Sequence, residues 1–268
     1  MNAIYKSAGA LAALLLAPAA GAALVTFEAA GANPAAITAA RDAFRAALGG
    51  VPREINWDGV PDTLADPNLL PGNFFNTTSP RGAVFSTPGT GFLVSANAGG
   101  ATPTLFGFPL DFQTFSAQRL FTAVNSNITD VTFFVPGTAI AATTSAFAAI
   151  FVDVEVANQT QMEFFDQNNS LISSQYVLAW ANQGLSFSGA VANAGEKIAR
   201  VRLTSGANTI TSNGTLGNQS DAIKDVVVMD DFLYAEPSQV VPEPSSLALA
   251  GLGLLCGLGW MRRRRPEA

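Results

Sequence analysis

The sequence predicts a mainly β fold, a sandwich or barrel formed by one domain, and three observations support this. After Gly50 the chain consists of short apolar or alternating segments that recur about every 8–12 residues, as strands do in all-β folds. Clusters of Gly, Pro, Asn, Ser and Thr separate these segments, which is typical of turns. A single clear soluble segment has the periodicity and end signals of a helix, so we expect helix to form a small part of the domain. About 220 residues between the two ends are enough for one well-cored domain.

The first two elements are a strand and a helix. Leu24–Glu28 reads Leu-Val-Thr-Phe-Glu and alternates as a strand does. Asn33 is a suitable N-cap, Pro34 fits the first helical position, and Gly49-Gly50 ends the segment, so we expect a helix over about 34–48. Its apolar residues fall near one face, which predicts packing on a sheet.

The remaining segments predict strands connected by hairpins and longer loops. The predicted strands are Glu54–Asp58, Gly82–Ser86, Gly91–Ser95, Arg119–Val124, Val131–Val135, Phe147–Val156, Gln161–Asp166, Leu171–Leu178, Leu185–Val191, Lys197–Thr204 and Val226–Ala235. Asp166–Asn169 predicts a hairpin turn, and Pro61–Pro80 predicts a long surface loop. The pairs Phe74-Phe75, Phe133-Phe134 and Phe164-Phe165 are each expected to turn one ring inward.

Both ends of the chain carry export and anchoring signals. Residues 1–22 contain one lysine, an apolar stretch too short to span a bilayer and a small-residue cleavage site, which predicts a secretory signal peptide; a plain N-terminal anchor is the alternative. Residues 245–261 carry no charge and predict a short transmembrane helix. The basic stop after it should stay cytoplasmic; it consists of Arg262, Arg263, Arg264 and Arg265. The predicted organisation is signal peptide 1–22, sandwich 23–236, linker 237–244, transmembrane helix 245–261 and cytoplasmic tail 262–268.

The C-terminal segment resembles a known sorting signal. Pro242, Glu243 and Pro244, a glycine- and leucine-rich span and an arginine cluster together resemble the PEP-CTERM signal of Gram-negative bacteria. The resemblance implies recognition of the Pro-Glu-Pro motif by exosortase, a membrane transpeptidase. It also implies a link to exopolysaccharide and biofilm matrix. The mature protein either keeps the helix or loses it, as other processed anchors do.

Charge and missing residue types exclude several functions. Residues 23–240 contain nine basic and eighteen acidic residues, a net charge of −9, which argues against binding nucleic acid. The chain has no histidine, so a Ser-His-Asp triad and the usual zinc sites are excluded. Cys256 is the one cysteine and lies in the predicted anchor, so the exported domain has no disulfide or thiol nucleophile.

The last predicted strand carries a second resemblance. Residues 227–234 read Val-Val-Met-Asp-Asp-Phe-Leu-Tyr and, with the strands from Asp153 onward, are similar to extracellular jelly-roll, galactose-binding-like modules. This implies a single jelly-roll-like sandwich with a structural calcium, for which Glu28 and Asp231 (or Asp230) are the matching positions. Since side chains alternate along a strand, one aspartate should face inward. The alternative is that one aspartate faces solvent while the other accepts backbone hydrogen bonds.

Other acidic residues are weaker candidates. Asp58, Asp62 and Asp66 recur at four-residue spacing between prolines and are interpreted as a solvated loop. Asp153 and Glu155 would share one strand face, a spacing compatible with the paired carboxylates of a glycosidase. Eighteen acids in one domain also produce such a pair by chance, so we assign no catalytic residue.

The sequence favours an exported, exosortase-sorted surface or extracellular-matrix protein with a non-catalytic structural or adhesive role, including weak glycan binding. The precursor is expected in the inner membrane facing the periplasm before it reaches the cell surface or matrix. Trp57 and Trp180 could stack on sugars, although core packing is the expected role of both. The alternative function is a carboxylate-dependent glycoside hydrolase or lyase. No cofactor is required other than the proposed calcium.

Overall fold

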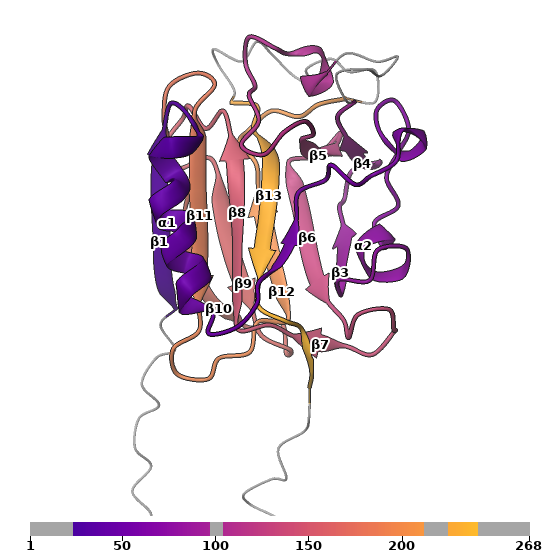
Figure 1. Cartoon of the computed structure of the whole chain (residues 1–268), viewed down its shortest axis with the longest axis vertical. Coiled ribbons are helices and arrows are strands. Elements are labelled where there is room, and N and C mark those ends of the chain that lie inside the picture. The colour runs from indigo at the N-terminus through magenta and orange to yellow at the C-terminus, as the bar shows by residue number, and fades with distance from the viewer. Residues whose placement is uncertain (1–23, 97–103, 212–224, 241–268) are drawn as a thin grey trace, which may run out of the picture.

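The structure, a computed structural model, describes residues 24–96, 104–211 and 225–240, which form antiparallel sheets with few helices (Figure 1). The strands are β1 (Val25–Gly31), β2 (Arg53–Ile55), β3 (Ala83–Ser86), β4 (Gly91–Val94), β5 (Phe121–Val124), β6 (Ile128–Phe133), β7 (Ala142–Thr143), β8 (Ala146–Val152), β9 (Gln161–Phe165), β10 (Leu171–Tyr176), β11 (Leu185–Val191), β12 (Arg200–Thr204), β13 (Val228–Tyr234) and β14 (Ser238–Gln239). The predicted mainly β class is confirmed.

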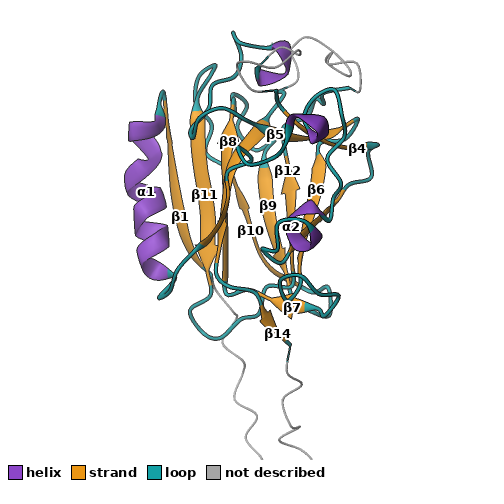
Figure 2. Cartoon of the chain, turned by 45° about the vertical axis from the view of Figure 1, so that its right-hand side comes forward, coloured by secondary structure: helices purple, strands orange, loops and turns teal. Residues whose placement is uncertain are grey.

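Two sheets lie face to face as two layers (Figure 2). The larger sheet has the order β1-β11-β8-β13-β5-β4, and β2 also pairs with β13. The smaller sheet has the order β10-β9-β12-β6-β3, and β14 pairs with β7 in a separate ribbon. The predicted hairpin at Asp166–Asn169 joins β9 to β10; Asp166 Oδ1 accepts hydrogen bonds from the backbone N–H groups of Asn168 and Ser170, both at 2.8 Å.

The predicted N-terminal helix is α1 (Pro34–Ala47). The Asn33 side chain accepts a hydrogen bond from the Ala36 N–H at 3.3 Å, which satisfies one backbone donor of the first turn. Ile37 and Phe44 are buried on the face toward the sheet. The Phe44 ring makes edge contacts with Phe27 of β1 and Phe187 of β11, both at 5.8 Å between ring centroids. The helix therefore covers the outer face of the larger sheet at its β1 edge, as expected.

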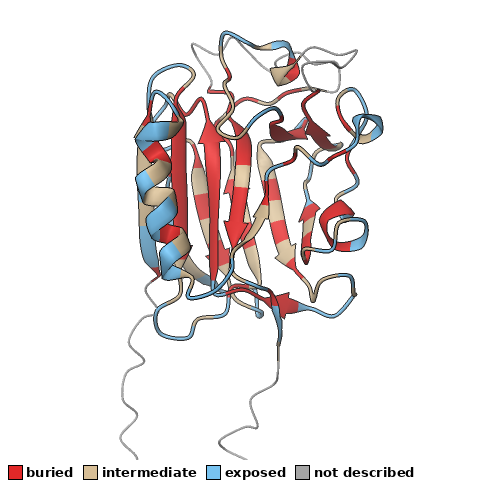
Figure 3. Cartoon of the chain, in the orientation of Figure 1, coloured by how far each residue is buried: buried red, intermediate tan, exposed pale blue. Residues whose placement is uncertain are grey.

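The larger sheet is covered on both faces, whereas the smaller sheet has one face toward solvent. Every residue of β8 is buried, as the continuous red strand in Figure 3 shows. One face of β8 meets the smaller sheet, and the other meets an outer layer formed by α1 and residues 105–115. In contrast, β6, β9 and β12 alternate between buried and half-buried residues. This alternation is typical of an antiparallel sheet with one face toward water.

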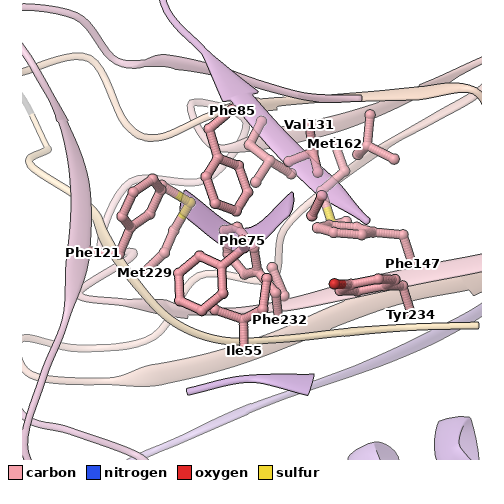
Figure 4. Close-up of a cluster of buried hydrophobic side chains, with 14 of the residues drawn as sticks. Ile55, Phe75, Phe85, Phe121, Val131, Phe147, Met162, Met229, Phe232 and Tyr234 are labelled. Carbon is pink, nitrogen blue, oxygen red and sulfur yellow. The ribbon is translucent and has the colours of Figure 1, made fainter. Parts of the chain in front are cut away.

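The core between the sheets is rich in aromatic rings. Phe147 lies over Tyr234, and Phe85 and Phe121 lie near Phe232 (Figure 4). Trp57 is 1% exposed and stacks on Phe121 with 4.0 Å between ring centroids. The edge contacts of Phe232 with Phe85 and Phe121 are of the kind that stabilises a fold by about 0.5–1.5 kcal/mol beyond burial.

The paired phenylalanines behave as predicted only where they lie on strands. Phe133 and Phe164 are buried while the neighbouring rings Phe134 and Phe165 are half-buried, as strand alternation requires. Phe74 and Phe75 are both buried, so the prediction of one inward ring is wrong there. They begin a short helix, α2 (Phe74–Thr77), which packs on β3. Successive helical side chains do not alternate between two faces.

The short helices and strands of the structure were not predicted from the sequence. Besides α2, two 3₁₀ helices at Asp62–Leu64 and Leu105–Gly107 and the β7–β14 ribbon were not expected. Leu70, Phe74 and Phe75 are buried, so Pro61–Pro80 is not simply a surface loop. The strand β14 lies inside the predicted linker 237–244, so pairing with the domain continues into that segment.

The predicted membrane segment lies outside the described residues. Signal peptide 1–22, the transmembrane helix 245–261 and tail 262–268 fall wholly beyond the described part of the chain. Among the helices within that part, none combines the length and the apolar character needed to cross a bilayer.

Candidate functional site

The predicted sorting residues Pro242, Glu243 and Pro244 and the basic stop at 262–265 also lie outside the described residues. The described chain reaches Val240, just after β14. Figure 2 shows β14 at the lower end of the sandwich, beside β7. The start of β1 lies at the same end, because Val25 pairs with Val191 and Val191 with Ala146, just after β7. The two ends of the domain therefore leave it on one side.

The predicted calcium residues Glu28 and Asp231 are not neighbours. Glu28 is on β1 and Asp231 on β13, with β11 and β8 between their strands. Three interstrand spacings of about 4.8 Å place the strands roughly 14 Å apart, whereas calcium binds oxygens at about 2.3–2.6 Å. Burial raises the pKa of Glu28. Within the part of the chain that the structure describes, no three His, Cys, Asp or Glu side chains are grouped to hold a metal ion.

The Asp230-Asp231 pair forms a β-bulge. The register between β13 and β8 shifts between Met229 and Phe232, so two residues of β13 oppose one of β8. The Ser116 hydroxyl lies 2.7 Å from Asp231 Oδ1 and 3.2 Å from Asp230 Oδ1, so both carboxylates leave the strand on the same side. Asp230 is fully buried, as was expected of one of the two, and Asp231 is half-buried. The bulge turns the second carboxylate to the same side, which alternation along an unbroken strand does not predict.

The bulge places two neighbouring carboxyls in a buried environment. Burial raises the pKa of Asp230 well above its usual range, and the charge of Asp231 raises it further. Burial also raises the pKa of Asp231. The Phe115 N–H donates to Asp230 Oδ2 at 2.6 Å, and Trp57 Nε1 donates to the Asp230 backbone carbonyl at 2.7 Å. The bulge thus ties the 115–116 segment and the Trp57 loop to β13.

The acids interpreted as a solvated loop are partly structural. Asp62 forms an ion pair with the buried Arg119 guanidinium, which also donates to the Ser95 carbonyl at 3.0 Å. Asp58 Oδ1 accepts the Arg119 backbone N–H at 3.3 Å. Burial raises the pKa of Asp66. Asp58 and Asp62 therefore help fix the entry to β5. Asp62 is exposed, as a solvated loop requires, whereas Asp58 and Asp66 are half-buried.

Asp153 and Glu155 do not share a strand face, because β8 ends at Val152 and Asp153 has a left-handed φ of 70°. Asp153 Oδ1 accepts a hydrogen bond from the Gln183 N–H at 2.7 Å. The Glu155 backbone N–H donates to Asp225 Oδ2 at 3.2 Å. The acids at this end of the sandwich thus bind loop backbone, and the paired-carboxylate geometry expected from a continuous strand is not formed.

The two candidate tryptophans have different environments. Trp57 packs in the core, as expected. Trp180 is 46% exposed, so the expectation of core packing is wrong for it. Its backbone is fixed by a hydrogen bond from the Trp180 N–H to the Val154 carbonyl at 2.7 Å. A Cβ atom at Gly184 would lie 2.8 Å from Trp180 Cδ1, so the ring packs directly on that glycine.

Two surface cavities have volumes in the range of small-molecule sites. One of about 480 Å³ lies between residues 69–72 and 85–92. The other, of about 450 Å³, is here called the Arg81 cavity. Its lining residues are Asn56, Trp57, Gly59, Pro61, Leu64, Phe74, Phe75, Thr78, Ser79 and Arg81. Neither lining includes an acidic residue.

The comparison with known families identifies the C-terminal segment, because residues 240–265 match the PEP-CTERM protein-sorting motif. The chain carries a PEP-CTERM sorting motif. The predicted motif residues Pro242, Glu243 and Pro244 lie within the matched range, and so do the four arginines. This motif implies export, processing by exosortase and membrane-linked sorting toward the cell surface.

The comparisons for the rest of the chain are limited. No curated protein matches it. Among solved structures, it is similar to the Podospora anserina GH26-CBM35 β-(1,4)-mannanase, with a TM-score of 0.26 and 14% sequence identity. The match covers 61% of this chain and 29% of the mannanase chain, so this chain corresponds to less than a third of that protein.

Proposed function

We propose that this chain is an exosortase-processed protein of the cell surface or extracellular matrix with a structural or adhesive, non-catalytic role. The PEP-CTERM motif at residues 240–265 carries the proposal, because it is a signal for sorting toward the cell surface. The domain before it is a two-layered sandwich with a dense aromatic core. Its acids mainly hold backbone and arginine groups, which fits a structural module better than a catalytic one.

The strand order supports assignment of this domain to the jelly-roll class. Eight strands from β5 to β13, leaving out β7, form the orders β5-β13-β8-β11 and β6-β12-β9-β10. Neighbouring strands within each sheet are mostly distant in sequence, as in the two Greek keys of a jelly roll. Jelly rolls occur in lectin and capsid domains, whose roles are binding and assembly.

Trp180 supports weak glycan binding as the adhesive role. Its ring is half exposed, although its backbone is held by Val154 and its side chain packs on Gly184. Tyr176 and Leu178, on the same segment, are also about half exposed. An aromatic face that is fixed in position and open to solvent can stack on a sugar ring at little entropic cost.

A pull-down of the full-length chain in detergent on immobilised matrix polysaccharide tests the binding role. Trp180→Ala should lower retention by up to about tenfold, because an aromatic contact contributes about 0.5–1.5 kcal/mol. Val51→Ser removes a more exposed apolar side chain elsewhere and should leave retention unchanged. Failure of the unaltered chain to bind any polysaccharide would refute glycan binding and leave the sorting assignment intact.

A further inference from the structure

Arg81 differs from the other arginines of the described chain in having no carboxylate partner. Residues 24–96, 104–211 and 225–240 contain seven arginines. Six of them form ion pairs with Asp or Glu: Arg41, Arg45, Arg53, Arg119, Arg200 and Arg202. Among the described residues, the Arg81 guanidinium contacts the Phe75 ring, at 5.8 Å from its centroid, and no acid. Within the described ranges, Arg81 is thus a guanidinium that an external anion can pair with.

The backbone holds Arg81 in a fixed position. Its N–H donates to the Phe75 carbonyl at 2.9 Å. Its carbonyl accepts a hydrogen bond from the hydroxyl of the buried Tyr234 at 3.1 Å. The side chain is half-buried and lies over Phe75. The backbone is thus fixed, and the half-buried side chain has less freedom than a fully exposed arginine, so that binding an anion restricts fewer rotamers.

The Arg81 cavity combines this cation with an apolar wall and neutral polar groups. Trp57, Phe74, Phe75 and Leu64 supply the apolar part. Asn56, Thr78 and Ser79 bring an amide and two hydroxyls, which can donate and accept hydrogen bonds. The absence of acids from this lining means that a bound carboxylate meets no like charge there. The cavity therefore suits a ligand with an apolar face, several hydroxyls and one carboxylate.

We propose that the Arg81 cavity binds a uronate unit of an acidic polysaccharide, with Arg81 holding the sugar carboxylate and the cavity wall contacting the sugar ring. A planar guanidinium binds a carboxylate through two parallel hydrogen bonds, which a neutral sugar cannot form. The inference rests on the proposed glycan-binding function and names the sugar class and a site separate from Trp180.

Calorimetric titration of the full-length chain in detergent tests this, with tri-galacturonate and the same trisaccharide after reduction of its carboxyl groups. The acidic ligand should bind about tenfold or more tightly than the reduced one, since hydrogen bonds to charged groups contribute about 1.5–3 kcal/mol. Arg81→Gln should abolish this preference, and Arg81→Lys should retain part of it. Arg53→Gln, which removes an arginine paired with Glu236, should leave it unchanged.

A second variant keeps the test independent of the fold around Arg81. Thr78 is exposed and lines the cavity, and Thr78→Glu should weaken the acidic trisaccharide about tenfold more than the reduced one. Equal affinity for the two ligands, or full preference retained in Arg81→Gln, would overturn the uronate site alone. Binding of neither ligand, together with failure of the polysaccharide pull-down, would overturn glycan binding as a whole.

Discussion

The Asp230-Asp231 bulge predicts an unusual pH dependence of stability, which Asp230→Asn should remove. Asp230 is fully buried beside a second carboxyl, and burial together with the charge of Asp231 raises its pKa. The substitution keeps an oxygen that can accept the Phe115 N–H, and its new amide can donate to Asp231. It therefore removes the titrating proton with little change in volume.

The sign and size follow from proton linkage. A raised pKa means that the folded state holds the proton more tightly than the unfolded state, whose aspartate ionises near 3.8. The contribution to stability is present at low pH and is lost as pH rises from the unfolded pKa through the folded one. Each unit of pKa difference corresponds to about 1.4 kcal/mol. Asn has no such proton, so this loss should not occur in the variant.

Urea unfolding of the full-length chain and of Asp230→Asn at about pH 4 and about pH 8 measures the effect. The free energy of unfolding of Asp230→Asn minus that of the unaltered chain should be larger at about pH 8 than at about pH 4, by about 1.4 kcal/mol for each unit of pKa difference. An unchanged difference would show that Asp230 is ionised in the folded state at neutral pH. A decrease would show that the bulge stabilises the charged form.

Two further substitutions test the packing and the ion pairs with the same unfolding assay. Asp130→Asn should lower the free energy of unfolding by about 1.5–3 kcal/mol at neutral pH. Burial alone would raise the pKa of Asp130. Hydrogen bonds from Arg202 and Arg200 outweigh this effect and lower the pKa. This contribution is present above the unfolded pKa of 3.8 and is lost as pH falls through the lower folded pKa, so an equal loss at strongly acid pH would contradict the ion-pair explanation. Trp57→Phe removes the donor to the Asp230 carbonyl and should cost about 1–3 kcal/mol; a neutral result would mean that water replaces this hydrogen bond.

The sequence predicted the strands well because their signals are local. Alternation, turn residues and the Asn33-Pro34 helix start each depend on neighbours in the chain, and all appear in the structure near their predicted positions. Several strands were predicted to extend too far: β2 ends at Ile55, β6 at Phe133, β8 at Val152 and β10 at Tyr176. After β8 the residues still alternate between acidic and apolar, and after β10 they stay apolar, so the sequence pattern cannot locate these strand ends.

The candidate sites were predicted less well because they depend on pairing. Asp230 is buried, as was expected of one of the two aspartates, but the register shift against β8 places the Asp231 carboxylate on the same side, which alternation does not predict. Glu28 and Asp231 were matched by their place in the first and last strands, but strand order separates them. Arg81 has no local signal in the sequence. It stands out only once the partners of the other arginines are known.

The sorting motif is best tested by the fate of the chain in cells with and without exosortase. We predict that the unaltered chain reaches the cell surface in a shorter form when exosortase is present. Replacement of Pro242, Glu243 and Pro244 by alanine should leave the full-length precursor in the inner membrane, whereas Pro237→Ala should behave as the unaltered chain. Equal surface delivery of the motif variant, or delivery that does not depend on exosortase, would contradict the assignment of the PEP-CTERM segment as the signal that directs this protein.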